Sequence, residues 1–83
     1  MYRVVVQKKA EKELGEIDQR YRRRILAALV FLREEPLRGK KIGGKYKHRY
    51  GIRVWPYCVV YEVNKRRRVV LVVRIGHRQE VYR

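Results

Sequence analysis

The chain has 83 residues, and its 23 lysines and arginines far outnumber its 8 aspartates and glutamates, giving a formal charge of +15. We expect one small domain over residues 1–83, with a thin core that buries only about 60–65% of the unfolded chain's surface. A charge this large attracts polyanions, so the candidate partners are nucleic acid, an anionic membrane surface or an acidic protein.

The positive charge is concentrated in the second half of the chain. Residues 1–35 carry 9 basic and 6 acidic side chains, whereas residues 36–83 carry 14 basic and 2 acidic ones. We therefore expect the second half to face the polyanion.

Other residue types narrow the class of protein further. Cys58 is the single cysteine, which excludes an intrachain disulfide and a zinc site with several cysteines, and we expect neither a metal nor another cofactor. No apolar run reaches the roughly 18 residues needed to cross a membrane. We also expect no signal peptide, and hence a cytoplasmic protein with no membrane partner.

The first half of the chain predicts a strand and then two helices. Residues 2–7 are short and rich in valine, as in a strand. Residues 8–14 predict a short helix that Gly15 ends in the C′ position. Asp18 offers an N-cap for a second helix, whose apolar residues recur at helical spacing from Tyr21 to Leu32.

The second half predicts a loop and then three strands. Residues 37–45 are rich in glycine and lysine, which is typical of a loop. Strand patterns follow at 46–54, 57–63 and 68–75. The expected fold class is α+β, with an N-terminal strand, a helical hairpin, and then a mostly antiparallel sheet of about four strands that carries the hairpin on one face.

Alternation along the predicted strands sorts the arginines by face. If Ile52 and Val54 face the helices, Arg53 faces outward together with Gly51 and Arg49. In the next strand Val59 and Tyr61 share one face and Cys58 and Val60 the other, and the sequence leaves open which face is inward.

Arginines on an outward face suit RNA. Together with Arg78 and Tyr82 near the end of the chain, Arg49 and Arg53 would form a basic surface with one aromatic ring. Arginines neutralise phosphates, and aromatic rings stack on unpaired bases. The plainer alternative is that these are ordinary solvated strand residues.

Several short motifs in this order resemble the RelE/ParE toxin superfamily, and the RelE branch most of all. They are LRG at 37–39, YGIRV at 50–54, YCVVYEV at 57–63, GHR at 76–78 and VY at 81–82. The resemblance covers nearly the whole chain. It implies a RelE-like fold and a toxin of a type II toxin–antitoxin system, held inactive by an acidic antitoxin protein.

The resemblance also implies an activity. RelE-like toxins cut messenger RNA in the ribosomal A site without a metal and leave a 2′,3′-cyclic phosphate. Arg53 then matches a basic residue of the central strands, and Arg78 the arginine at the scissile phosphate. Tyr82 matches the C-terminal tyrosine, which stacks on the base or assists proton transfer. His77 is a candidate base because the charge of Arg78 disfavours its protonated form, although the family often places a basic residue there without that role.

The remaining basic residues of this region are expected to meet ribosomal or messenger RNA. They are Arg38, Lys40, Lys41, Lys45, Lys47 and Arg49.

Two positions depart from the family pattern. Gly51 stands where the family usually has a basic residue, and Cys58 where it usually has an arginine. Loss of two cations weakens the stabilisation of a phosphorane. Three interpretations stay open: Arg49, His48 or His77 compensates, the enzyme is weak, or the toxin acts elsewhere, as ParE-like relatives do on DNA gyrase. A non-catalytic RNA-binding module is a further alternative.

Overall fold

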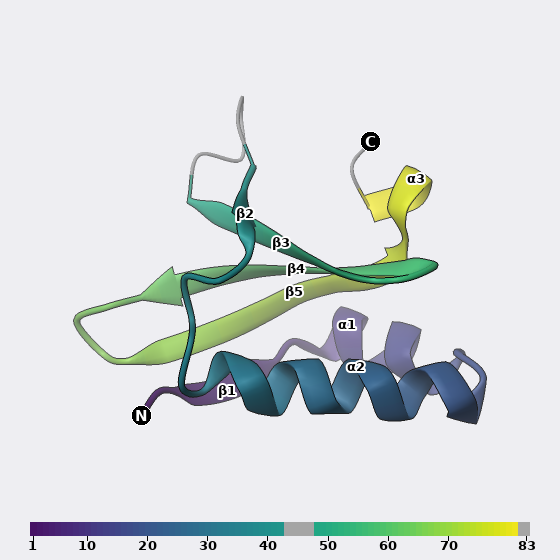
Figure 1. The fold of residues 1–83 in the computed structure, drawn as a ribbon, viewed down its shortest axis with the longest axis horizontal. Helices are drawn as coiled ribbons and strands as arrows, with labels where there is room; N and C mark the ends of the chain where they lie inside the picture. The colour runs from purple at the N-terminus through teal and green to yellow at the C-terminus, as the bar shows by residue number, and fades with distance from the viewer. Residues whose placement is uncertain (43–47, 82–83) are drawn as a thin grey trace.

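The computed structural model describes residues 1–42 and 48–81. Its elements in chain order are β1 (Arg3–Val6), α1 (Lys8–Gly15), α2 (Gln19–Leu32), β2 (Lys40–Lys41), β3 (Arg49–Val54), β4 (Tyr57–Asn64), β5 (Val69–His77) and α3 (Arg78–Val81). The sheet order is β1-β5-β4-β3-β2, and only the β1–β5 pair is parallel. In Figure 1, α1 and α2 lie along one side of the sheet and α3 lies on the other. The α+β prediction is confirmed, with five strands.

The helical hairpin begins and ends largely as predicted. The Asp18 carboxylate caps α2 by accepting a hydrogen bond from the backbone N–H of Arg20 at 2.9 Å, and this bond lowers the pKa of Asp18. The C′ role of Gly15 is wrong. Gly15 is the last residue of α1, and the helix ends through Glu16 in a right-handed conformation. The N–H of Glu16 donates to the carbonyl of Glu13, and the N–H of Ile17 donates to the carbonyl of Leu14.

The core lies between the helices and one face of the sheet. The apolar stripe of α2 buries Ile25, Leu29 and Leu32 against sheet residues that include Val59 and Tyr61. Full burial of such side chains contributes roughly 1.5–3 kcal/mol each. The face that the sequence left open is thereby decided: Val59 and Tyr61 point to the helices.

A second, smaller apolar cluster lies on the opposite face. It consists of Cys58, Val60, Val73 and Val81, the last of these contributed by α3. The sequence did not predict α3. Its one buried residue, Val81, brings the end of the chain onto this face of the sheet.

A β-bulge in β5 supplies both faces with apolar side chains. Tyr61 pairs with Val72 while Val60 pairs with Arg74, so Val73 is the extra residue. Strict alternation would place Val72 and Ile75 on opposite faces. With the bulge, both reach the core beneath the helices.

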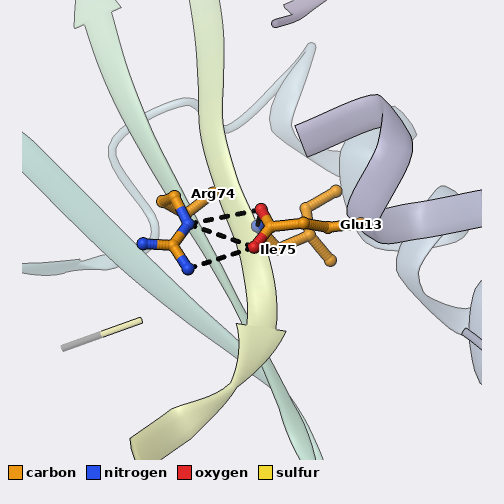
Figure 2. Close-up of polar contacts among 3 residues, drawn as sticks. All are labelled: Glu13, Arg74 and Ile75. Carbon is orange, nitrogen blue, oxygen red and sulfur yellow. Dashed lines mark hydrogen bonds and ion pairs between the residues drawn. The ribbon is translucent and has the colours of Figure 1, made fainter. Parts of the chain in front are cut away.

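Glu13 of α1 closes an edge of the sheet that β1 leaves open. β1 pairs with β5 only from Val69 to Val72, so the following part of β5 has no strand on that side. There the Glu13 carboxylate accepts a hydrogen bond from the N–H of Ile75 at 3.0 Å and binds the Arg74 guanidinium at 3.1–3.3 Å (Figure 2). One side chain thus joins α1 to the sheet.

The loop predicted at 37–45 contains a short strand. In β2, Lys40 pairs with Gly51 and Lys41 with Tyr50. A Cβ at Gly39 would lie 2.9 Å from the carbonyl oxygen of Gly51, so the close approach of the two backbones requires glycine at position 39. Among the described residues, no helix is both long enough and apolar enough to cross a membrane.

Candidate functional site

A hollow of about 560 Å³ opens on the sheet face away from α1 and α2. We call it the basic hollow. It is lined by Arg38, Gly39, Lys40, Lys41, Ile42, Gly51, Ile52, Arg53 and Arg78. Five of these described residues are cations and none is acidic. The hollow therefore brings α3 together with β2 and β3, which lie much earlier in the sequence.

Strand alternation and the start of α3 bring Arg53 and Arg78 together. Arg53 is exposed on β3 between Ile52 and Val54, which pack against the helix-side core. Arg78 is the first residue of α3, directly after β5. The two arginines also line a smaller adjoining depression with Trp55. They therefore flank one site.

The cations of the basic hollow have no acidic partner among residues 1–42 and 48–81. The ion pairs among the described residues are Asp18–Arg20, Glu62–Arg49 and Glu13–Arg74, and none of them includes a cation of the hollow. Like charges in a concave site add their fields. The hollow is thus suited to a phosphate-bearing ligand.

Tyr61 holds one wall of the basic hollow in place. Its hydroxyl accepts a hydrogen bond from the N–H of Gly39 at 2.9 Å, although its ring is buried beneath the sheet and stacked on Tyr50. Burial raises the pKa of Tyr61 and outweighs the Gly39 hydrogen bond, which lowers it. The neutral hydroxyl therefore anchors the segment that carries Arg38 and Lys40. Sequence reasoning missed this role because Tyr61 has the pattern of a core strand residue.

The two departures from the family pattern lie close to the site and supply no charge. Gly51 is buried and lines the basic hollow. Cys58 is 1% exposed and packs in the small apolar cluster with Val60 and Val81. In the register, Cys58 stands between Arg53 of β3 and Gly76 of β5.

Some predicted site residues lie elsewhere. His77 pairs with Tyr57, and their rings are 4.8 Å apart; the Tyr57 ring in turn contacts Tyr21 of α2. His77 thus does not line the basic hollow, and the geometry gives its role as a base no support. Arg49 lies further along β3 and binds Glu62 at 2.9 Å. Lys45, Lys47 and Tyr82 fall outside the described residues.

A metal site is not evident in the part of the chain that the structure describes. There, no group of three or more histidine, cysteine, aspartate or glutamate side chains is placed to hold an ion. The chemistry available at the basic hollow is that of its guanidinium and ammonium groups, which bind phosphates and stabilise negative charge.

A two-helix layer lies on one face of the sheet and a cationic hollow opens on the other. The family model "ParE toxin of type II toxin-antitoxin system, parDE" matches residues 4–82, and the chain belongs to this family, within the RelE/ParE superfamily. No curated protein sequence matches the chain.

Solved structures of RelE toxins share the fold. The toxin–antitoxin complex RelBE2 from Mycobacterium tuberculosis is 24% identical, with a TM-score of 0.86 over 93% of this chain and 98% of that one. The archaeal RelE–RelB complex from Pyrococcus horikoshii OT3 is 27% identical, with a TM-score of 0.81 over 93% and 94%. The isolated E. coli RelE toxin is 28% identical, with a TM-score of 0.79 over 99% and 92%.

Proposed function

We propose that this toxin is a ribosome-dependent endoribonuclease that cuts messenger RNA in the A site. The observation that carries the proposal is the basic hollow, where Arg53 and Arg78 stand with three further cations and no acid among the described lining residues. Such a surface binds the RNA backbone and can stabilise the charge of a phosphorane.

The cut itself needs charge stabilisation and two proton transfers. The ribose 2′-oxygen attacks phosphorus after losing its proton, and the 5′-oxygen leaves as it gains one, which yields a 2′,3′-cyclic phosphate and a 5′-hydroxyl end. We assign the stabilisation of the negative charge to Arg53 and Arg78. A guanidinium has donors but no acceptor, so neither arginine can serve as the base. Tyr82 is our candidate for base stacking or proton transfer, and His77 is the weaker candidate base.

The remaining cations are proposed to bind RNA. Lys40, Lys41 and Arg38 enter the basic hollow from the β2 side, where they can hold the backbone on either side of the scissile phosphate. Lys45, Lys47 and Arg49 are proposed to add contacts to the ribosome.

Primer extension on messenger RNA in programmed ribosomes tests the activity. We expect cuts inside the A-site codon with the purified toxin. We expect Arg78→Ala to lower the cutting rate by about 100-fold or more, as with loss of one transition-state donor. Arg78 is exposed, so circular dichroism and the melting temperature should stay unchanged. Arg23→Ala on α2 is the matched control. An Arg78→Ala protein that cuts as fast as the parent would remove Arg78 from the site.

Inhibition of DNA gyrase is the second candidate function. Gly51 and Cys58 favour it, because neither brings a cation to the site, and the matching family model is that of ParE toxins. Folded toxin that leaves ribosome-bound messenger RNA intact but blocks supercoiling by gyrase would establish it. A protein that binds ribosomes and does neither would be the non-catalytic RNA-binding module.

We further propose an acidic antitoxin as the partner of α2. Its outer face exposes Leu26, Val30 and Phe31 by 46%, 60% and 42%, and Leu37 is exposed beyond its end. Exposed apolar residues on a chain of +15 charge fit a segment that is both apolar and acidic. Several of the similar solved structures are complexes of a RelE toxin with a RelB antitoxin, among them those from Pyrococcus horikoshii OT3 and Methanococcus jannaschii.

A substitution in this apolar face tests the antitoxin surface. We expect Val30→Asp to weaken binding of the purified antitoxin by about 10-fold or more, because it places a charge in the apolar contact. Gln19→Asp adds the same charge at the exposed start of α2 and should change the affinity less than threefold, roughly the scatter of surface substitutions. Isothermal titration calorimetry measures both, and equal losses would place the antitoxin elsewhere.

A further inference from the structure

A second hollow, of about 740 Å³, lies where β1 meets the β4–β5 hairpin. We call it the hairpin hollow. Its apolar lining residues are Val5, Val63, Val69 and Leu71, of which Val5 is 36% exposed. Its basic lining residues are Arg3, His48, Lys65, Arg66 and Arg67. The acid among its described lining residues, Glu62, binds Arg49 at 2.9 Å.

Hydrogen bonds fix the turn of the β4–β5 hairpin, which carries four cations. The Asn64 side chain accepts a hydrogen bond from the N–H of Arg67 at 3.0 Å, which closes the turn. Arg68 follows with φ 54°, a left-handed conformation that is unfavourable for most residues other than glycine. Its carbonyl accepts a hydrogen bond from the N–H of Arg3 at 2.9 Å. Residues 65–68 are four consecutive cations, and an arginine occupies the position where glycine would be easiest.

Both hollows open on the same face of the sheet. In β1, Arg3 and Val5 alternate with Val4 and Val6, which pack against the helix-side core. Leu71 packs against the small cluster on the opposite face, the face to which Arg53 also points. Nothing from α1 or α2 lines either hollow.

The distance between the hollows suits a short single strand. His48 of the hairpin hollow precedes Arg53 of the basic hollow by five positions on or next to β3, which corresponds to about 17 Å at about 3.3 Å per residue. A stacked nucleic-acid strand advances about 3.4 Å per nucleotide, so about five nucleotides reach from one hollow to the other.

We propose that the hairpin hollow is a second RNA subsite, which binds the backbone of the same single strand that enters the basic hollow. Arg66 and Arg67 neutralise phosphates, and Val5, Val69 and Leu71 receive an unpaired base. Arginine suits this double task because its planar guanidinium pairs with phosphate and stacks on bases. The inference rests on RNA as the ligand in the proposed function, but it concerns binding and needs no cleavage.

Fluorescence anisotropy with short RNA tests the subsite. The probes are fluorescein-labelled 2′-O-methyl oligouridylates of about four and about ten nucleotides, which lack the 2′-hydroxyl needed for cleavage; at about 3.4 Å per nucleotide only the longer one spans both hollows. The Arg66→Ala/Arg67→Ala variant is compared with Lys8→Ala/Lys9→Ala, which removes two exposed cations from α1. The melting temperatures of both variants are measured as a check on folding.

We expect the hairpin variant to lose salt-dependent binding to the longer probe only. The slope of log affinity against log salt should fall by about 1.4, since a single strand loses about 0.7 for each phosphate contact. The α1 variant should keep the parental slope, and the shorter probe should not distinguish the proteins. An abasic ten-mer should bind the parent several-fold more weakly than the oligouridylate.

Several results would overturn the inference. If the hairpin variant and the α1 variant lose the same amount of salt dependence, the effect comes from net charge and not from a defined subsite. Equal losses for both probe lengths would mean that no single strand spans the hollows, and an oligoglutamate of matched charge competing equally well would mean an acidic-peptide site. Cuts at the ribosome with no change in slope would refute this inference alone. A change in slope without cuts would refute the proposed function alone.

Discussion

At the scale of single residues, the hydroxyl of Tyr61 has a structural role at the site. It is the acceptor for the N–H of Gly39, 22 residues earlier in the chain, and this bond holds the β2 side of the basic hollow. A single oxygen atom thereby connects the helix-side core to the cations on the other face. The strand pattern around Tyr61 predicts burial but does not reveal this bond, because the partner comes from a loop.

Tyr61→Phe should destabilise the protein. It leaves the Gly39 N–H without its acceptor, at a cost of about 1–2 kcal/mol near neutral pH. It should also weaken RNA binding, because the segment of Arg38 and Lys40 loses its anchor. Urea unfolding measures the first effect and anisotropy the second. Tyr21→Phe is the control, because the Tyr21 hydroxyl makes no hydrogen bond within the described residues. If the urea midpoint of Tyr61→Phe equals that of the parent, the bond from Gly39 contributes nothing to stability.

The raised pKa of Tyr61 adds a pH dependence with a definite sign. The folded state holds the phenolic proton more tightly than the unfolded state, so the contribution is complete below the ordinary pKa of about 10 and is lost as pH rises through the folded-state pKa. Phenylalanine at position 61 has no such proton. The stability difference between the parent and Tyr61→Phe should therefore shrink above about pH 10.

At the scale of elements, α1 and β5 are joined by one carboxylate. The Glu13 carboxylate accepts the hydrogen bond of the Ile75 N–H that a neighbouring strand would otherwise accept, and it pairs with Arg74. Both charged side chains are less than a third exposed. The join lies where β1 ends and the sheet would otherwise have an open edge. The sequence predicts α1 and β5 separately, but it does not reveal their contact, because Glu13 and Arg74 are 61 positions apart.

Substitutions of Glu13 should destabilise the protein in a graded way. Glu13→Ala removes the acceptor for the Ile75 N–H and leaves Arg74 unpaired, which should lower the free energy of unfolding by about 2–3 kcal/mol. Glu13→Gln keeps one acceptor oxygen and should cost less. Glu11→Ala, on an exposed position of the same helix, should stay within about 0.5 kcal/mol. Chemical denaturation ranks the three, and a Glu13→Ala protein as stable as Glu11→Ala would contradict the role of Glu13.

At the scale of the whole molecule, the +15 charge is the dominant property. The described residues contain three ion pairs, so most of the described cations have no acidic partner among these residues. Repulsion among them opposes the compact state, and a polyanionic partner relieves it. The same charge on which the proposed RNA binding depends would also make the proposed acidic antitoxin a stabilising partner.

Salt should therefore stabilise this toxin in the absence of partners. Raising sodium chloride from 0.1 to 1 M shortens the Debye length from about 10 to about 3 Å, which screens the repulsion. We expect the melting temperature to rise by about 4–8 °C, the shift that corresponds to about 1 kcal/mol. A Lys65→Glu/Arg67→Glu variant carries less positive charge, so its melting temperature should rise less over the same change in salt. A melting temperature that falls with salt would show that the ion pairs outweigh the repulsion.

The sequence by itself determined most of the elements: the first strand, the two helices of the hairpin and the three later strands. Valine-rich runs, the Asp18 cap and the stripe from Tyr21 to Leu32 are local patterns, and local patterns reflect backbone propensity and burial. The motifs around Arg53 and Arg78 likewise identified the two arginines that line one hollow.

Only the tertiary structure decided which residues meet. The bulge at Val73, the strand β2, the buried Val81 of α3 and the bonds from Glu13 and Tyr61 all depend on partners distant in the sequence. His77 illustrates the difference: it adjoins Arg78 in the chain, yet its ring lies against Tyr57 because it faces the helix side of β5. Proximity across a sheet follows from register and packing, which a local pattern does not contain.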